Sequence, residues 1–140
     1  AVNSLLDEID SEMTALMNHQ NPKIVSAAEN IIEANNTARS VAAHILGGAN
    51  TPRRPATSGS NYLMLLGTLC GGWLMARSGA AAADALAKGE NGAVGNDDFM
   101  TIKLTTMQIY MTHHLPKISS LARTITDGDG AALAMQPNWL

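Results

Sequence analysis

Apolar side chains recur at steps of three and four residues through the first third of the chain, which is the spacing of one face of an α-helix. The first stripe predicts a helix over Ser4–His19 and consists of Leu5, Ile9, Met13 and Leu16. A second helix opens at Asn21-Pro22, because asparagine caps a helix well and proline fits its first position, and it ends at Gly47-Gly48. Asn35 and His44 are the polar residues on or beside its apolar stripe, and we expect them to be hydrogen-bonded in the core.

The third predicted helix, Tyr62–Ala87, is apolar or small on nearly every face and has Arg77 as its only charged residue before Asp84. A helix that is apolar all round belongs inside a protein core or a membrane. Its unbroken apolar run ends at Ala76 and is shorter than the about 20 residues that cross a bilayer. The pattern therefore predicts no membrane span and a central, fully buried third helix.

Four glycines lie within this third helix: Gly67, Gly71, Gly72 and Gly79. Each costs about 1 kcal/mol of helix propensity relative to alanine, so their presence needs a physical reason. We interpret them as sites where a neighbouring helix approaches closely, as small residues allow where helix backbones touch. Room for a ligand between helices and a break in the helix are the alternatives.

A fourth, long helix is predicted over Asp98–Thr126, capped by the asparagine and aspartates at positions 96–98. Its core stripe comprises Met100, Leu104, Met107, Met111, Leu115, Ile118, Ala122 and Ile125. Pro116 lacks a backbone donor and its ring presses on the carbonyl of Thr112, so we expect a kink there. Asp127-Gly128 predicts the end of the helix, followed by a turn.

Two segments rich in proline or glycine, Ala49–Ser60 and Lys88–Asn96, are predicted loops. The four helices together predict an all-α fold, an up-and-down four-helix bundle that forms a single helical domain over residues 1–140. The composition agrees, since 46% of the residues are hydrophobic but only 4% are aromatic, which suits a helical core better than a β-sandwich.

The net charge of −3 offers no electrostatic footprint for nucleic acid, so we expect no nucleic-acid partner. Cys70 is the only cysteine; it cannot form a disulfide within the chain and is interpreted as a small buried hydrophobic residue. The first twenty residues lack the basic start and continuous apolar block of a signal peptide, and we expect a cytoplasmic protein. The sequence does not begin with methionine, and we expect it to be part of a longer chain.

Three groups of polar residues are candidates for a metal site. The acidic residues of the first helix, Asp7, Glu8, Asp10 and Glu12, lie where the helix dipole favours negative charge, and we interpret them as a solvated face. His113 and His114 are adjacent and therefore diverge around a helix, whereas ligand pairs stand three or four apart. A calcium loop starting at Asp127 would require glutamate at its twelfth position, where Asn138 stands. We therefore predict no metal site.

One further motif suggests a different class of function. His114-Leu115-Pro116-Lys117 has the His-x-x-Lys spacing of histidine phosphotransfer domains, which are also small four-helix bundles. Those domains usually carry glycine next, leaving room for phosphohistidine, but Ile118 follows here and proline stands inside the motif. A phosphotransfer role for His114 is kept as a minority hypothesis.

The third and fourth helices carry a more specific resemblance. The segments YLMLLG at 62–67 and GWLMAR at 72–77 resemble the C-terminal extra domain of a subgroup of bacterial acyl-CoA dehydrogenases that includes 3-methylmercaptopropionyl-CoA dehydrogenase. The second match consists of Phe99-Met100, Lys103-Leu104, Leu115-Pro116, Ile125 and Gly128. Met100 replaces an aromatic residue often found there, and the first two helices match in pattern only. The resemblance covers most of the chain, through packing motifs.

The resemblance implies that the chain is the C-terminal accessory domain of a larger flavoenzyme that carries out FAD-dependent α,β-dehydrogenation of acyl-CoA thioesters. In that family a glutamate of a preceding domain is the base and the flavin accepts the hydride. We therefore assign no catalytic, cofactor-binding or metal residue in this sequence, and Glu29, Glu33 and Glu90 are not given the role of the base. The enzymatic activity and the FAD belong to the parent protein.

The same resemblance implies a structural cover that supports the oligomer and the substrate site. The expected partners are the preceding domains of the same chain, further copies in a homo-oligomer, and the acyl-CoA bound by the parent. Trp139 and Leu140, at the apolar end of the chain, are candidate docking contacts. A stand-alone four-helix interaction module without an enzymatic parent is the alternative from another class.

Overall fold

The computed structural model describes residues 1–47 and 53–139, and within these ranges the fold is all-helical, without a β-strand. This confirms the predicted all-α class. The elements are α1 (Val2–Leu16), α2 (Pro22–Leu46), α3 (Arg54–Ala87), α4 (Phe99–Ile109), the π-helix η1 (Tyr110–His114), α5 (Lys117–Ala134) and the short 3₁₀-helix η2 (Pro137–Trp139). Among the described residues no helix is both long enough and apolar enough to cross a membrane.

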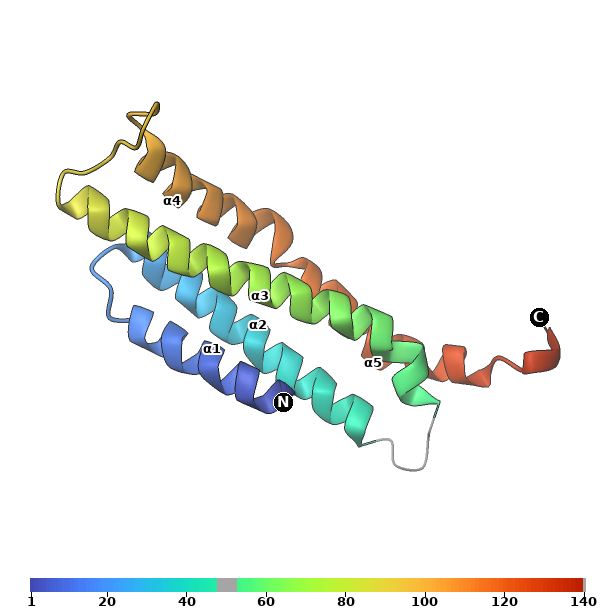
Figure 1. Cartoon of the computed structure of the whole chain (residues 1–140). Coiled ribbons are helices and arrows are strands. Elements are labelled where there is room, and N and C mark those ends of the chain that lie inside the picture. The colour runs from blue at the N-terminus through green and yellow to red at the C-terminus, as the bar shows by residue number, and fades with distance from the viewer. Residues whose placement is uncertain (48–52, 140) are drawn as a thin grey trace.

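The long helices lie side by side along a common direction (Figure 1). Helix α1 packs on α2, α2 packs on α3, and α3 is in contact with α4 on one half of its length and with α5 on the other. Helix α5 also packs on α2, which closes the core between these elements. The end of the chain after α5 projects beyond the other helices in Figure 1.

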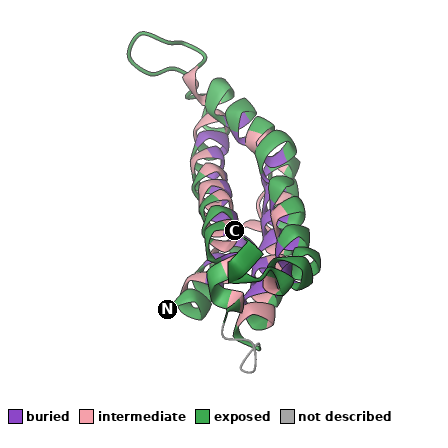
Figure 2. Cartoon of the chain, turned by 90° about the vertical axis from the view of Figure 1, so that its right-hand side faces the viewer, coloured by how far each residue is buried: buried purple, intermediate pink, exposed green. Residues whose placement is uncertain are grey.

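Most of the core comes from the apolar stripes that the spacing predicts, but in α1 Leu6 is buried where the prediction has Leu5, and Leu5 and Leu16 are only partly buried. Side chains of α1, α2 and α5 that face inward are buried, among them Leu6, Ile9, Met13, Ile24, Ile31 and Ile118. Figure 2 shows buried residues on the inner sides of the helices and exposed residues on the outer sides. The asparagine cap of α2 is also confirmed, because Asn21 Oδ1 accepts a hydrogen bond from the Lys23 N–H at 2.9 Å.

Helix α3 is not fully buried, so that prediction is wrong. One face, including Leu65 and Leu69, is completely inside the core, whereas Leu63 is 72% exposed and Leu74 is 56% exposed on the opposite face. The other helices cover one side of α3 and leave an apolar side to solvent. Among residues 1–47 and 53–139, no other helix covers this side of α3, and exposed apolar surface of this kind is typical of a contact surface.

Three of the four glycines in α3 are explained by close packing, which confirms the preferred interpretation for them. A Cβ at Gly71 would lie 2.9 Å from Tyr110 Cζ, and a Cβ at Gly79 would lie 3.2 Å from Met107 Cβ. A Cβ at Gly72 would lie 3.0 Å from a methyl group of Leu115. Gly67 differs, because a Cβ there would meet nothing within 4 Å. Among the residues that the structure describes, the close approach predicted for Gly67 is therefore wrong.

The first predicted loop is wrong over Arg54–Ser60, because α3 already begins at Arg54; residues 48–52 lie outside the described part of the chain. Proline is tolerated in the first turn of a helix, where its missing N–H has no intrahelical partner anyway, and Pro55 occupies such a position. The predicted end of α2 is confirmed at Gly47, whose N–H donates to the Ala43 carbonyl at 2.8 Å. Gly48 lies outside the described residues.

The loop after α3 is confirmed, but the cap of α4 is made differently from the prediction. Asp98 precedes the helix and makes no side-chain capping bond. Instead, Asn91 reaches across the loop, and its Oδ1 accepts from the Thr101 N–H at 3.0 Å while its carbonyl accepts from the Met100 N–H at 2.9 Å. The capping group therefore comes from earlier in the loop than the aspartates.

The predicted interruption at Pro116 is confirmed, and its form is a π-helical segment. Helix α4 ends at Ile109, and the Leu115 N–H then donates to the Tyr110 carbonyl at 3.0 Å, a step of five residues. The wider turn accommodates the proline, which has no N–H and would otherwise press on the preceding turn. Tyr110 anchors the segment, since its hydroxyl donates to the Thr68 carbonyl of α3 at 2.8 Å.

Asn35 is completely buried between α2 and α1, as predicted. Its Nδ2 donates to the Leu6 carbonyl at 2.8 Å, whereas its Oδ1 has no hydrogen-bond partner. We expect Asn35→Leu to change the free energy of unfolding by less than about 1 kcal/mol, because burial of apolar volume offsets the single lost bond. Asn35→Ala leaves a cavity and is expected to cost about 2 kcal/mol. Urea unfolding of both variants tests this, and a larger loss in the leucine variant would contradict it.

Candidate functional site

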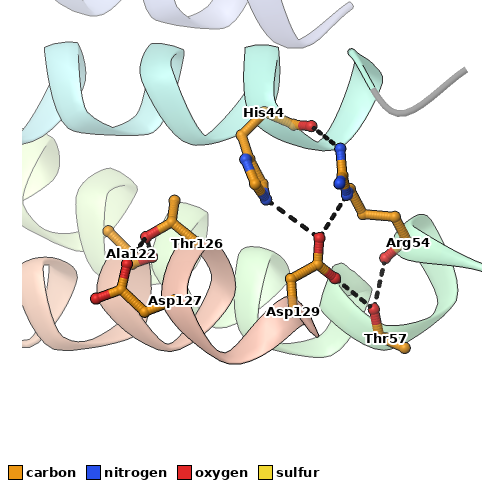
Figure 3. A network of polar contacts seen from close by, with 7 residues as sticks. All are labelled: His44, Arg54, Thr57, Ala122, Thr126, Asp127 and Asp129. Atoms are coloured by element: carbon orange, nitrogen blue, oxygen red, sulfur yellow. Dashed lines mark hydrogen bonds and ion pairs between the residues drawn. The ribbon is translucent and has the colours of Figure 1, made fainter. Parts of the chain in front are cut away.

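The most connected buried polar group of the described residues joins α2, α3 and α5 (Figure 3). We call His44, Arg54, Thr57 and Asp129 the Asp129 cluster. The Asp129 side chain, only 4% exposed, forms an ion pair with Arg54 Nε, and His44 Nε2 lies 3.2 Å from its Oδ2. The Thr57 hydroxyl lies 3.1 Å from Oδ1, and Arg54 Nη1 donates to the His44 carbonyl at 3.2 Å. Both carboxylate oxygens are therefore occupied.

The Asp129 cluster stabilises the ionised form of its carboxylate. Desolvation alone would raise the pKa of Asp129, but the hydrogen bonds from Thr57, Arg54 and His44, together with the charge of Arg54, outweigh desolvation and lower that pKa. An Asp129 carboxylate that is charged and fully hydrogen-bonded is a structural acceptor. It leaves no free oxygen with which to abstract a proton, and Thr57 is held as a donor, so the arrangement fits a structural link between helices.

The same cluster corrects the predicted end of the last helix. The sequence predicts a stop at Asp127-Gly128, yet α5 continues to Ala134 through Gly128 and Gly130. The buried ion pair and hydrogen bonds of Asp129 hold this turn against the first turn of α3 and the last turn of α2. Sequence reasoning missed the pairing of Arg54 with Asp129, because the two residues are far apart in the chain and neither belongs to a local motif.

We expect the contribution of Asp129 to stability to depend on pH. Its pKa is lower in the folded chain than the ordinary value of 3.8, so the unfolded chain binds the proton more readily as the pH falls. The stabilisation is present above about pH 4–5 and is lost as the pH falls through the folded pKa. Thermal unfolding of the wild type and of Asp129→Asn should be compared from about pH 2.5 to about pH 7. The difference in Tm between the two proteins should shrink below about pH 4. A difference that grows on acidification would contradict this.

The acidic face of α1 is only partly solvated, which corrects the sequence interpretation. Arg39 of α2 donates to Asp7 Oδ1 at 2.7 Å and to Asp10 Oδ2 at 2.9 Å. Glu12 accepts from the indole N–H of Trp73 at 2.8 Å and lies 3.4 Å from Arg77, so it links α1 to α3. Three of the four carboxylates therefore connect helices, while Glu8 is exposed.

His19 links the turn after α1 to the end of α3. Its Nε2 lies 2.8 Å from Asp84 Oδ1, and its Nδ1 accepts a hydrogen bond from the Asn21 N–H at 3.0 Å. A carboxylate can only accept, so Nε2 carries the proton in this arrangement. The contact fixes the α1–α2 turn against α3, and it also explains a polar residue that the sequence analysis left without a role.

The histidines considered as ligands or as phosphate acceptors lie on the outer side of the π-helix. His113 and His114 are exposed, and His114 Nδ1 is 3.4 Å from Lys117 Nζ while its ring lies 5.2 Å from that of Tyr110. Ile118 is buried in the core, so the position that follows the His-x-x-Lys spacing is filled by packing. The structure thus places His114 and Lys117 together, and among the described residues neither of them forms an ion pair with a carboxylate.

The other candidate residues are not brought together. Asp127–Ala134 is helical, so this segment does not have the conformation of a calcium loop. Glu29, Glu33 and Glu90 are exposed; the first two lie one turn apart on α2, whereas Glu90 lies in the loop after α3. Within residues 1–47 and 53–139, no three histidine, cysteine or carboxylate side chains are close enough to hold a metal ion. Trp139 is 67% exposed, and Leu140 lies outside the described residues.

Cys70 and His44 are two further residues for which the sequence predicts a place in the core. Cys70 is half-buried on α3, less enclosed than predicted, and partial burial raises the pKa of its thiol. His44 does take the predicted hydrogen-bonded role, with Asp129 as its partner. The His44–Asp129 pair is also bonded to Arg54 and Thr57 and joins three helices. The described polar side chains are arranged to join helices.

With this geometry in place, the comparison with known families is informative. The model of the family described as acetyl-CoA dehydrogenase C-terminal like matches residues 5–136. This match spans nearly all of the chain, and the chain therefore belongs to that family. No curated protein and no solved structure gives a significant match.

Proposed function

We propose that this chain is the C-terminal accessory domain of an FAD-dependent acyl-CoA dehydrogenase of the 3-methylmercaptopropionyl-CoA dehydrogenase type. The parent enzyme carries out α,β-dehydrogenation of acyl-CoA thioesters in the cytoplasm. The observation that carries the proposal is the family match over residues 5–136. The domain, an up-and-down four-helix bundle, has the role of a structural cover that supports the oligomer and the substrate site.

The polar contacts support a structural role for this domain. Its most buried carboxylate, Asp129, is occupied by Arg54, His44 and Thr57, and its most buried amide, Asn35, is tied to a backbone carbonyl. A general base needs a free oxygen within hydrogen-bonding reach of the substrate. These groups lack one, so the catalytic base and the reacting atoms belong to the preceding domains of the parent.

The described residues do not fit a flavin site either. A flavin pyrophosphate is held by several free backbone or side-chain donors, often at a helix start behind a glycine-rich turn. The buried side-chain atoms without a hydrogen bond are Asn35 Oδ1, which is an acceptor, and Arg54 Nε, which faces Asp129. We therefore assign FAD to the preceding domains of the parent enzyme.

The proposal is tested on the complete reading frame that contains residues 1–140. We expect that protein to show a visible flavin band that bleaches when an acyl-CoA thioester is added without oxygen. The 140-residue chain alone is expected to be colourless and inactive, and a frame lacking this domain should keep its flavin but lose thermal stability. A colourless complete protein would overturn the proposal, as would stoichiometric FAD bound to the 140-residue chain.

The second candidate function is a stand-alone helical interaction module. The exposed apolar side of α3, with Leu63 and Leu74, is the observation that favours it, because such a surface marks a contact with another protein. A reading frame that encodes no dehydrogenase body would support the module. Bleaching of a flavin band by acyl-CoA in the complete protein would exclude it.

A further inference from the structure

The uncovered side of α3 has a regular pattern. Eight positions follow steps of four and three residues along it; seven are exposed and the eighth, Cys70, is half-buried. We call them the outer stripe: Ala56, Ser60, Leu63, Gly67, Cys70, Leu74, Arg77 and Ala81. Strict alternation of four and three is the spacing of a coiled-coil contact, which brings one line of side chains against a partner helix.

Gly67 stands at the middle of the outer stripe and lacks an explanation within the chain. The space beside Gly71 is occupied by Tyr110 and the space beside Gly79 by Met107, but a Cβ at Gly67 would meet nothing within 4 Å. A glycine in the interior of a long helix lowers helix stability by about 1 kcal/mol relative to alanine, and at an open position no packing contact offsets this loss. Between exposed Leu63 and Leu74, a glycine lets the backbone of another helix come close.

The outer stripe is also symmetric about its own centre. Read in either direction from the midpoint between Gly67 and Cys70, it has a small residue, then a leucine, then a polar residue, then an alanine. An antiparallel pair related by a twofold axis requires this self-complementarity, since each residue meets the counterpart on the other side of the midpoint. Leu63 would meet Leu74 of a second copy, and Gly67 would meet Cys70.

We propose that the outer stripe of α3 pairs antiparallel with the outer stripe of a second copy of this chain. The stripe is free of charge from Ala56 to Leu74, and its one charged residue, Arg77, lies 3.4 Å from Glu12 of the same chain, so the centre of the stripe has no charge that would repel an identical helix. The proposed function includes a homo-oligomer of the parent enzyme, and this inference rests on it only in naming the surface through which two copies meet.

The test measures the association of the 140-residue chain by sedimentation velocity. One helix pair buries less than the about 800 Å² per partner of a standard interface, so we expect a reversible dimer that forms between about 1 and 100 μM. Leu74→Glu is expected to weaken the dimer at least about 10-fold, because the glutamate would be buried against Leu63 of the second copy. Leu74 is exposed in the single chain, so the variant is expected to fold.

Gly67→Leu separates the effect on the dimer from the effect on the fold. The added side chain enters open space in the single chain and improves helix propensity, yet it holds two α3 helices apart. We expect a chain that unfolds at a higher temperature and dimerises at least about 10-fold more weakly. The matched control is Gly130→Leu on α5, another open helical glycine, which should leave dimerisation unchanged.

A mixing experiment tests the antiparallel register. Leu74→Glu and Leu63→Lys chains should each dimerise weakly alone but form a heterodimer together. In that heterodimer the introduced glutamate of one chain meets the introduced lysine of the other, while the two unchanged leucines meet each other. Leu74→Glu mixed with Leu74→Lys should show no recovery, since position 74 does not meet itself in this arrangement. Recovery in the second mixture instead of the first would overturn the antiparallel pairing.

The remaining outcomes are equally decisive. A wild-type chain that stays monomeric at the highest concentration would overturn the proposal. The preceding domains of the parent enzyme would then be the partner that covers the outer stripe. A dimer that is unaffected by Leu74→Glu and Gly67→Leu would also overturn it. None of these measurements involves flavin or acyl-CoA, so failure here is distinguishable from failure of the proposed function.

Discussion

Replacing Asp129 with alanine is expected to lower the Tm of the chain by about 10 °C. The carboxylate is 4% exposed and is the common acceptor for Arg54, His44 and Thr57. Its removal leaves a guanidinium that is mostly shielded from water without its counter-charge, and that loss exceeds the loss of the pair itself. Thermal unfolding followed by circular dichroism at neutral pH measures the effect.

A neighbouring aspartate on the same helix provides the control. Asp127 is exposed and contacts Arg123 one turn away at 3.3 Å, a surface pair of little energetic value. We expect Asp127→Ala to change the Tm by less than about 2 °C. Replacing both buried partners, as Arg54→Met with Asp129→Leu, should recover much of the loss. Equal losses for the two alanine variants would contradict the role given to Asp129.

The loss in Asp129→Ala should also be local. Without the carboxylate, the end of α5 keeps an exposed hydrogen bond from Arg53 to the Met135 carbonyl at 3.3 Å but loses its buried contacts with α3, and the glycines at 128 and 130 then favour an earlier helix end. Hydrogen exchange should therefore show faster amide exchange for residues 128–134 than in wild type, with little change in α1. The helix end predicted from Asp127-Gly128 would be restored by removing one side chain.

That result illustrates how far the sequence predicts this fold. The helices, the core stripes, the cap at Asn21 and the interruption at Pro116 depend on residues within a few positions of one another, and these predictions are confirmed. The continuation of α5 and the early start of α3 were missed. In both segments the residue that pairs across the helices, Arg54 in α3 and Asp129 in α5, has its partner far away in the chain, which local spacing cannot reveal.

The polar residues show the same limit. Asn35 could be predicted as a hydrogen-bonded core residue, because it stands on an apolar stripe, but its partner on α1 could not be named. The carboxylates of α1 looked solvated because their partners, Arg39, Trp73 and Arg77, lie on other helices. The exposure of α3 was missed for a related reason. Composition predicts that an apolar helix is covered, but it does not tell which chain supplies the cover.

Gly79→Leu is expected to lower the free energy of unfolding by about 3 kcal/mol, the upper end of the cost of overpacking a core. Gly79 is buried where α3 meets α4, and a Cβ there would lie 3.1 Å from Met107 Cγ and 3.2 Å from its Cβ. The methionine cannot simply swing aside, because its Cβ is fixed to the backbone of α4, so the two helices must move apart. Urea unfolding at low protein concentration measures the loss.

Gly67→Leu is the matched control, since it makes the same change at an exposed position of the same helix. A Cβ at Gly67 meets nothing within 4 Å, so the substitution should raise the free energy of unfolding of the single chain by about 0.5–1 kcal/mol through helix propensity. Opposite signs for the two variants would follow from packing alone, because their effects on the unfolded chain are the same. A loss at both positions would mean that Gly67 is already covered within the chain, and it would remove the ground for pairing two copies through α3.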